Sequence, residues 1–157
     1  MSYDVETIAN AFLRIAREDK SSISHMKMQK LLYFAQGHAL SLLNKTLIQD
    51  DCQAWDYGPV FPNLYRSLRR YGASEITEEI VDMHNPCRFE PKLTAEEDYL
   101  LREVWKKYGS LGAIHLSALS HATNGPWEQT RRSESNNKQG VIPKPLIKSY
   151  FNDLATD

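Results

Sequence analysis

The segment from His25 to Leu43 constrains the fold more than any other part of the chain. Written as a helix, it carries apolar residues around most of its circumference: Met26, Met28, Leu31, Leu32, Phe34, Ala35, Ala39, Leu42 and Leu43. A helix that is apolar nearly all round is buried on several sides. We therefore predict that residues 25–43 form the central helix of the domain, capped by hydroxyl groups in the Ser21–Ser24 segment.

The remaining segments predict shorter elements around this helix. Apolar spacing, capping residues and Gly or Pro breaks predict helices over residues 5–16, 62–71, 95–108, 111–122 and 142–154, and one turn over 127–131. Residues 46–62 predict a short extended hairpin, and the polar stretch 132–140 predicts a loop. The expected fold is mainly α. It is a compact bundle of about five to six helices around the central hydrophobic helix, with a hairpin-like segment, in a single domain over residues 1–157.

The composition argues for a protein of the cytoplasm. In 157 residues there are nineteen Lys and Arg against twenty Asp and Glu, and a net charge of −1 lacks the positive field of a dedicated nucleic-acid binder. Two cysteines are too few for a disulfide framework. The N-terminus is not basic, and no stretch approaches the roughly 18 apolar residues that span a bilayer. We expect a cytoplasmic location, no membrane association and little role for nucleic acid.

The sequence contains no recognisable catalytic arrangement. It has no GxSxG, P-loop or GxGxxG, and its histidines lack the spacing of metal ligands. The densest carboxylate cluster is Glu96, Glu97 and Asp98, but Thr94 with Glu97 forms a capping box, and the helix dipole favours acids in a first turn. We expect no catalytic residue, metal or cofactor, and no enzymatic activity. The alternative, a metal-dependent hydrolase or nuclease, requires carboxylates or histidines that converge in a cleft.

Large aromatic residues in a stiff loop are the first candidates for a binding surface. Trp55, Tyr57 and Phe61 lie among glycine and prolines in residues 55–62. Such side chains either fill the core or form a binding surface. We predict that Trp55 packs into the core and that the rigid Gly-Pro turn places Tyr57 and Phe61 at the surface.

A basic helix face is the second candidate. Arginines at 66, 69 and 70 alternate with tyrosines at 65 and 71, a pattern that suits either an ordinary solvated face or contact with a phosphate backbone. The nucleic-acid alternative requires these arginines to share one exposed face with Arg131 and Arg132. The candidate partner-binding residues are Tyr57, Phe61, Arg66, Arg69 and Arg70.

Four blocks of sequence resemble one known family. Residues 26–38 are MKMQKLLYFAQGH, residues 54–65 are AWDYGPVFPNLY, residues 116–121 precede Pro126 and Trp127, and residues 147–151 are IKSYF. In this order they resemble the SocA/GepA-like antitoxin domain, also called Panacea. The departures are Met28 for the usual Leu, Pro143 near the last helix, and a long loop at 133–140. The residues of these motifs, for which we expect structural roles, are Lys27, Gln29, Lys30, Leu31, Leu32, Tyr33, Gln36, Gly37, Trp55, Gly58, Pro59, Pro62, Tyr65, His121, Pro126 and Trp127.

The resemblance implies the antitoxin of a phage-associated toxin–antitoxin pair. Its partner is then a cognate protein toxin, neutralised by direct protein–protein binding or by a proteolytic adaptor mechanism that delivers the toxin to the ClpXP protease. A nucleic-acid-binding, phage-associated regulator is the alternative, and the oligomeric state stays open. Because they fall in the resembling blocks, we expect Trp55, Gly58, Pro59, His121 and Trp127 to meet in space.

Overall fold

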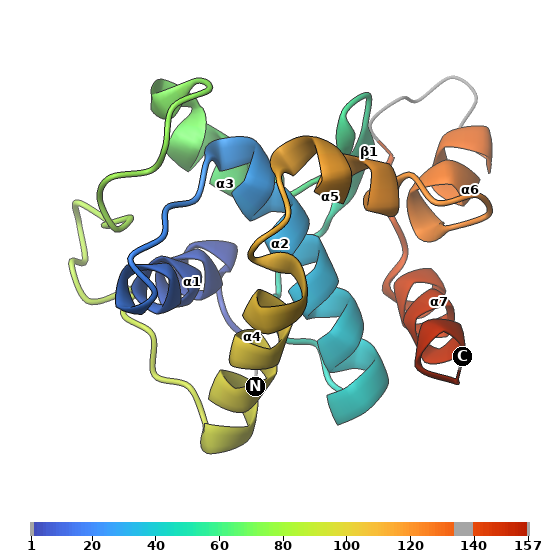
Figure 1. Cartoon of the computed structure of the whole chain (residues 1–157), viewed down its shortest axis with the longest axis horizontal. Coiled ribbons are helices and arrows are strands. Elements are labelled where there is room, and N and C mark those ends of the chain that lie inside the picture. The colour runs from blue at the N-terminus through green and yellow to red at the C-terminus, as the bar shows by residue number, and fades with distance from the viewer. Residues whose placement is uncertain (1, 134–139, 157) are drawn as a thin grey trace.

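The computed structural model describes residues 2–133 and 140–156 (Figure 1). These residues form seven α-helices and one two-stranded sheet, which confirms the mainly α prediction. The helices are α1 (Val5–Glu18), α2 (His25–His38), α3 (Pro62–Leu68), α4 (Ala95–Tyr108), α5 (Ala113–Ser120), α6 (Pro126–Ser133) and α7 (Lys144–Thr156). A π-helical turn, η1 (Ala39–Leu43), extends α2, and a 3-10 turn, η2 (Arg69–Tyr71), follows α3. No described helix is both long and apolar enough to cross a membrane.

Helix α2 runs through the middle of the molecule, as predicted, and contacts α1, α3, α4, α5 and α7 (Figure 1). Leu31 and Leu32 are fully buried. Phe34 stacks on Tyr108 of α4 with ring centroids 4.3 Å apart. Gly37 packs so closely against α7 that a β-carbon there would overlap the ring of Phe151. The segment is most exposed near its end, where Leu42 in η1 is 61% exposed.

Two buried glutamines of α2 hold extended segments against the helix. The side-chain oxygen of Gln36 accepts the amides of Leu47 and Ile48 at 3.2 and 2.9 Å, and its amide nitrogen donates to the Ile48 carbonyl at 2.9 Å. About two turns earlier, on the same side of α2, the Gln29 oxygen accepts the Phe61 amide at 2.8 Å. A side-chain amide that both donates and accepts satisfies the backbone groups of an extended segment on the side that faces α2. The neighbouring Leu47 carbonyl and Gln49 amide bond instead to the backbone of Tyr3. The two glutamines therefore fix the chain on both sides of the hairpin.

The predicted capping box begins α4. The Thr94 hydroxyl accepts the Glu97 amide at 3.1 Å, and the Glu97 carboxylate accepts the Thr94 amide at 2.9 Å. This carboxylate is buried and also accepts from Tyr3, at 2.6 Å, and from Lys45. Burial alone would raise the pKa of Glu97, but the hydrogen bonds from Lys45, Tyr3 and the Thr94 amide lower it to about 2. Glu97 is therefore a structural tie between α4 and the N-terminal segment.

The predicted hairpin consists of β1 (Gln53–Trp55) and β2 (Gly58–Val60), which pair antiparallel with Trp55 opposite Gly58. The segment before α7 runs antiparallel along the outer side of β1. The Ala54 amide donates to the Gly140 carbonyl at 2.8 Å, and the Ile142 amide donates to the Cys52 carbonyl at 2.8 Å. The hairpin is thereby tied to both α2 and the approach to α7.

The helix boundaries differ from the predictions in the C-terminal third. Helix α5 begins at Ala113 with Gly112 as its N-cap, not after Ser110. Helix α6 extends over Pro126–Ser133 where a single turn was expected, and α7 begins at Lys144 rather than residue 142. Ile142 instead adopts an extended conformation beside β1. The predicted loop over 132–140 falls mostly outside the described residues.

Candidate protein-binding site

Three of the resembling blocks meet beside the hairpin. The Trp127 indole nitrogen donates to the Trp55 carbonyl at 2.7 Å. The rings of His121 and Trp127 meet edge to face with centroids 4.0 Å apart. Pro59 lies opposite Ala54 in the same hairpin. The predicted convergence of these blocks is confirmed, and it joins β1, β2 and the turn between α5 and α6.

Gly58 is the point of closest approach in this cluster. Its φ of +116° is a conformation that side chains other than glycine rarely adopt. A β-carbon at Gly58 would lie 3.0 Å from the Lys30 Cε, 3.2 Å from the Lys30 Nζ and 3.2 Å from the His121 Cε1. Because Gly58 has no side chain, Lys30 and His121 can both pack closely against β2 at this position.

Lys30 itself is fully buried. Within the part of the chain that the structure describes, its Nζ has no hydrogen-bond partner. Burial lowers the pKa of Lys30 to about 8. A buried cation without a partner destabilises the folded state. Packing alone therefore does not explain a lysine at this position.

A second aromatic group supports the outer side of the hairpin. Tyr65 of α3 lies between His25 and Trp55, with ring centroids 5.2 and 5.1 Å away. Burial, followed by the nearby Lys30 charge, lowers the pKa of His25 to about 4, so this ring is neutral at physiological pH. Pro62 occupies the first turn of α3. Trp55 is only half-buried, so the prediction that it packs into the core is correct in part.

Tyr57 and Phe61 have opposite environments. Tyr57, at the tip of the hairpin, is 72% exposed, as predicted. The prediction for Phe61 is wrong, because its side chain is fully buried and its amide is held by Gln29. The chain passes from the exposed tip through β2, whose residues are all buried, and Phe61 follows them into the core.

The arginine candidates of α3 and η2 make no hydrogen bond or ring contact with Tyr57 among the described residues. Arg66 and Arg70 are exposed, and they bond within their own region, Arg66 with Asn63, and Arg70 with Tyr71 and Glu78. Arg69 is exposed in the same turn.

The two arginines that the nucleic-acid alternative adds lie on α6. Arg131 donates to the Ala54 carbonyl at 3.1 Å and to Asp56 at 2.7 Å. Arg132 donates to Asn124 at 2.9 Å. Both therefore serve contacts around the hairpin and the α5–α6 turn.

Helix α5 adds an apolar surface beside Tyr57 that the sequence analysis did not single out. The Ser117 hydroxyl donates to the Tyr57 carbonyl at 3.4 Å, which places α5 next to the hairpin tip. Leu116 faces the core, while Ile114 is 89% exposed and Leu119 is 40% exposed. We define the α5–hairpin surface as Tyr57, Ile114 and Ala118. The signal was available in the sequence AIHLSALS, because its apolar residues Ile114, Leu116 and Leu119 do not share one side of a helix and cannot all face the core.

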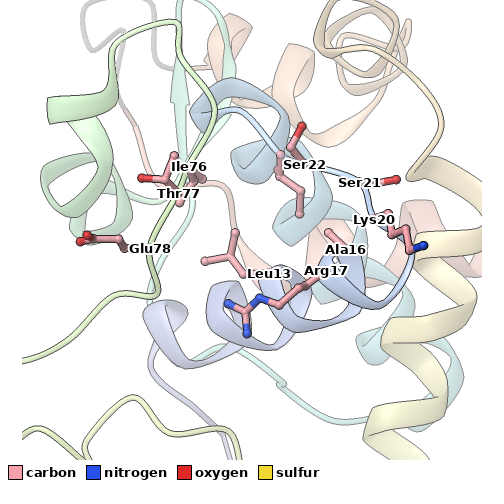
Figure 2. Close-up of a pocket in the computed structure, with 10 residues that line it drawn as sticks. Leu13, Ala16, Arg17, Lys20, Ser21, Ser22, Ile76, Thr77 and Glu78 are labelled. Carbon is pink, nitrogen blue, oxygen red and sulfur yellow. The ribbon is translucent and has the colours of Figure 1, made fainter.

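Hollows also lie elsewhere on the described part of the molecule. One, of about 190 Å³, lies between the end of α1 and residues 76–78 (Figure 2). Figure 2 shows the charged ends of Arg17, Lys20 and Glu78 pointing in different directions. Another, of about 400 Å³, lies between α4 and Leu42 of η1. Among the described residues, no three His, Cys, Asp or Glu side chains gather closely enough to hold a metal ion.

Comparisons with known proteins agree with the resemblance. Residues 28–128 match the family model described as Antitoxin SocA-like, Panacea domain. This range extends from α2 into α6 and includes the converging Trp55, Gly58, His121 and Trp127. The chain is 31% identical over 131 residues to Antitoxin SocA of Caulobacter vibrioides, an alignment that covers 81% of this chain and 70% of that protein. No solved structure matches the chain.

Proposed function

The chain belongs to the SocA-like antitoxin family with the Panacea domain, and from this premise we propose that it neutralises a cognate protein toxin by binding it directly, without catalysis. The single observation that supports binding is the α5–hairpin surface. A helix with an apolar face in water normally packs against something, and this one presents Ile114 at 89% exposure beside Tyr57 at 72%.

The composition of this surface fits a protein partner. Interface centres are enriched in aromatic and apolar side chains and depleted in charge, and a few such residues supply most of the binding energy. Tyr57 combines a large apolar area with a polar tip and has few side-chain rotamers to lose. The hairpin below it is held by Gln29, Gly58 and Trp127, so the tip is presented on a rigid base. Rigid presentation reduces the entropic cost of association.

Replacing Tyr57 or Ile114 by Ala is expected to weaken toxin binding about 30-fold or more for each variant, a hot-spot effect. Both side chains are largely exposed, so the free energy of unfolding should change by less than about 0.5 kcal/mol. Calorimetric titration with the toxin, together with denaturant unfolding, measures both quantities.

Leu42→Ala is the matched control, since Leu42 is an exposed apolar residue beside a different hollow. Its affinity for the toxin should equal that of the wild type. If Leu42→Ala loses binding while the Tyr57 and Ile114 variants retain it, the contact surface lies beside η1 and our assignment is wrong.

Co-expression with the cognate toxin separates direct binding from the adaptor mechanism. Direct binding should restore growth equally in a host with and without ClpXP. An adaptor that delivers the toxin for degradation would protect only the host that contains the protease. Rescue that disappears in the protease-deficient host would therefore overturn direct binding.

A further inference from the structure

The ammonium group of Lys30 lies close to Gly58 of the hairpin and has no hydrogen-bond partner in the described structure. Among the described residues, Cys52 is the side chain whose negative charge would favour the charged form of Lys30. Burial, however, raises the pKa of Cys52 and keeps this thiol neutral. A buried lysine that served only packing would be replaced by an apolar side chain at no loss of stability. This feature therefore points to a partner that the isolated chain lacks.

The surroundings of Lys30 indicate where such a partner would enter. Lys30 Nζ and His121 Cε1 both lie within 3.2 Å of the position that a β-carbon on Gly58 would take. Lys30 is fully buried and His121 is partly exposed, so His121 lies on the solvent side.

His121 is placed to cover Lys30 or to uncover it. It immediately follows α5, and its Nδ1 donates to the Ser117 carbonyl. Ser117 also contacts Tyr57. Ser117 therefore connects His121, which lies next to Lys30, with Tyr57 of the α5–hairpin surface.

We infer that an aspartate or glutamate side chain of the bound toxin reaches between the hairpin and the end of α5, displaces the His121 ring and accepts a hydrogen bond from Lys30. This inference rests on the proposed function and adds the chemistry of the partner: an acidic residue flanked by apolar residues that cover Tyr57 and Ile114. Shielded from water by those contacts, the charge pair would be short and strongly coupled.

The first test is Lys30→Met, an apolar side chain of similar length. It should fold at least as stably as the wild type, because it removes a buried charge without a partner, yet it should bind the toxin at least about 30-fold more weakly. Lys27→Met is the control on the same helix, since Lys27 already donates to the Gly109 carbonyl. It should leave toxin affinity unchanged.

The second test observes Lys30 directly in the wild-type protein. In the free chain, NMR titration of the Lys30 Cε–Nζ group should report a pKa near 8. A carboxylate partner favours the charged form, so in the toxin complex the pKa should rise to about 10 or above. This measurement does not depend on the folding of any variant.

The outcomes separate the two proposals. If the wild-type chain does not bind the toxin, the proposed function fails. If the wild type binds and Lys30→Met binds equally well, or the Lys30 pKa is the same in the complex as in the free chain, the inference about Lys30 is overturned while direct binding stands.

Discussion

Replacing Gln36 by Met should lower the free energy of unfolding by about 3 kcal/mol or more, because buried backbone groups left without partners cost about 1–3 kcal/mol each. Methionine has nearly the length of glutamine but provides neither a donor nor an acceptor of comparable strength. It would leave the Leu47 amide, the Ile48 amide and the Ile48 carbonyl without the contacts that Gln36 makes to them. Denaturant unfolding measures the loss.

Gln49→Met provides the same chemical change on the surface. Gln49 is exposed and its side chain contacts only Asp4 at the edge of the molecule among the described hydrogen bonds. Its free energy of unfolding should stay within about 0.5 kcal/mol of the wild type. If both glutamine variants lose equally little free energy of unfolding, the hydrogen bonds of Gln36 to residues 47 and 48 do not stabilise the fold.

Replacing Phe61 by Ala should cost about 3–5 kcal/mol, the range for truncating a buried aromatic side chain. Phe61 is fully buried directly after β2, and the cavity would lie beneath the hairpin that presents Tyr57. Toxin binding should weaken as a consequence of unfolding and should recover under conditions that stabilise the fold.

Tyr57→Ala should show the reverse combination, with stability retained and binding lost at every temperature. Thermal unfolding and affinity, measured on both variants, distinguish the two positions. A Phe61→Ala variant as stable as the wild type would contradict the burial of Phe61.

The sequence predicts the elements whose cause is local. The apolar circumference of residues 25–43 identifies the central helix, since such a helix must be covered on several sides. Thr94 and Glu97 identify the start of α4, because a capping box involves only one turn. The family blocks predict that the hairpin lies close to His121 and Trp127. The spacing of residues within one block does not predict this contact.

What the sequence does not predict depends on contacts between distant segments. Gln36 bonds to residues eleven and twelve positions away, and nothing in the local pattern names them. The opposite exposure of Tyr57 and Phe61 follows from the positive φ at Gly58 and from the burial of β2, which are properties of the folded chain. The apolar spacing predicts a helix over residues 111–122 but not which of its sides the fold covers, and Ile114 and Leu119 are exposed.

Titration of purified toxin activity with increasing amounts of this protein tests direct neutralisation most directly. With no protease present, we expect inhibition to rise in proportion to the antitoxin added and to saturate at a fixed molar ratio. The reason is that each antitoxin molecule inactivates a fixed number of toxin molecules. Tyr57→Ala should shift this curve toward higher concentrations. Complete inhibition at a trace ratio of antitoxin to toxin would show turnover, and it would contradict neutralisation by binding.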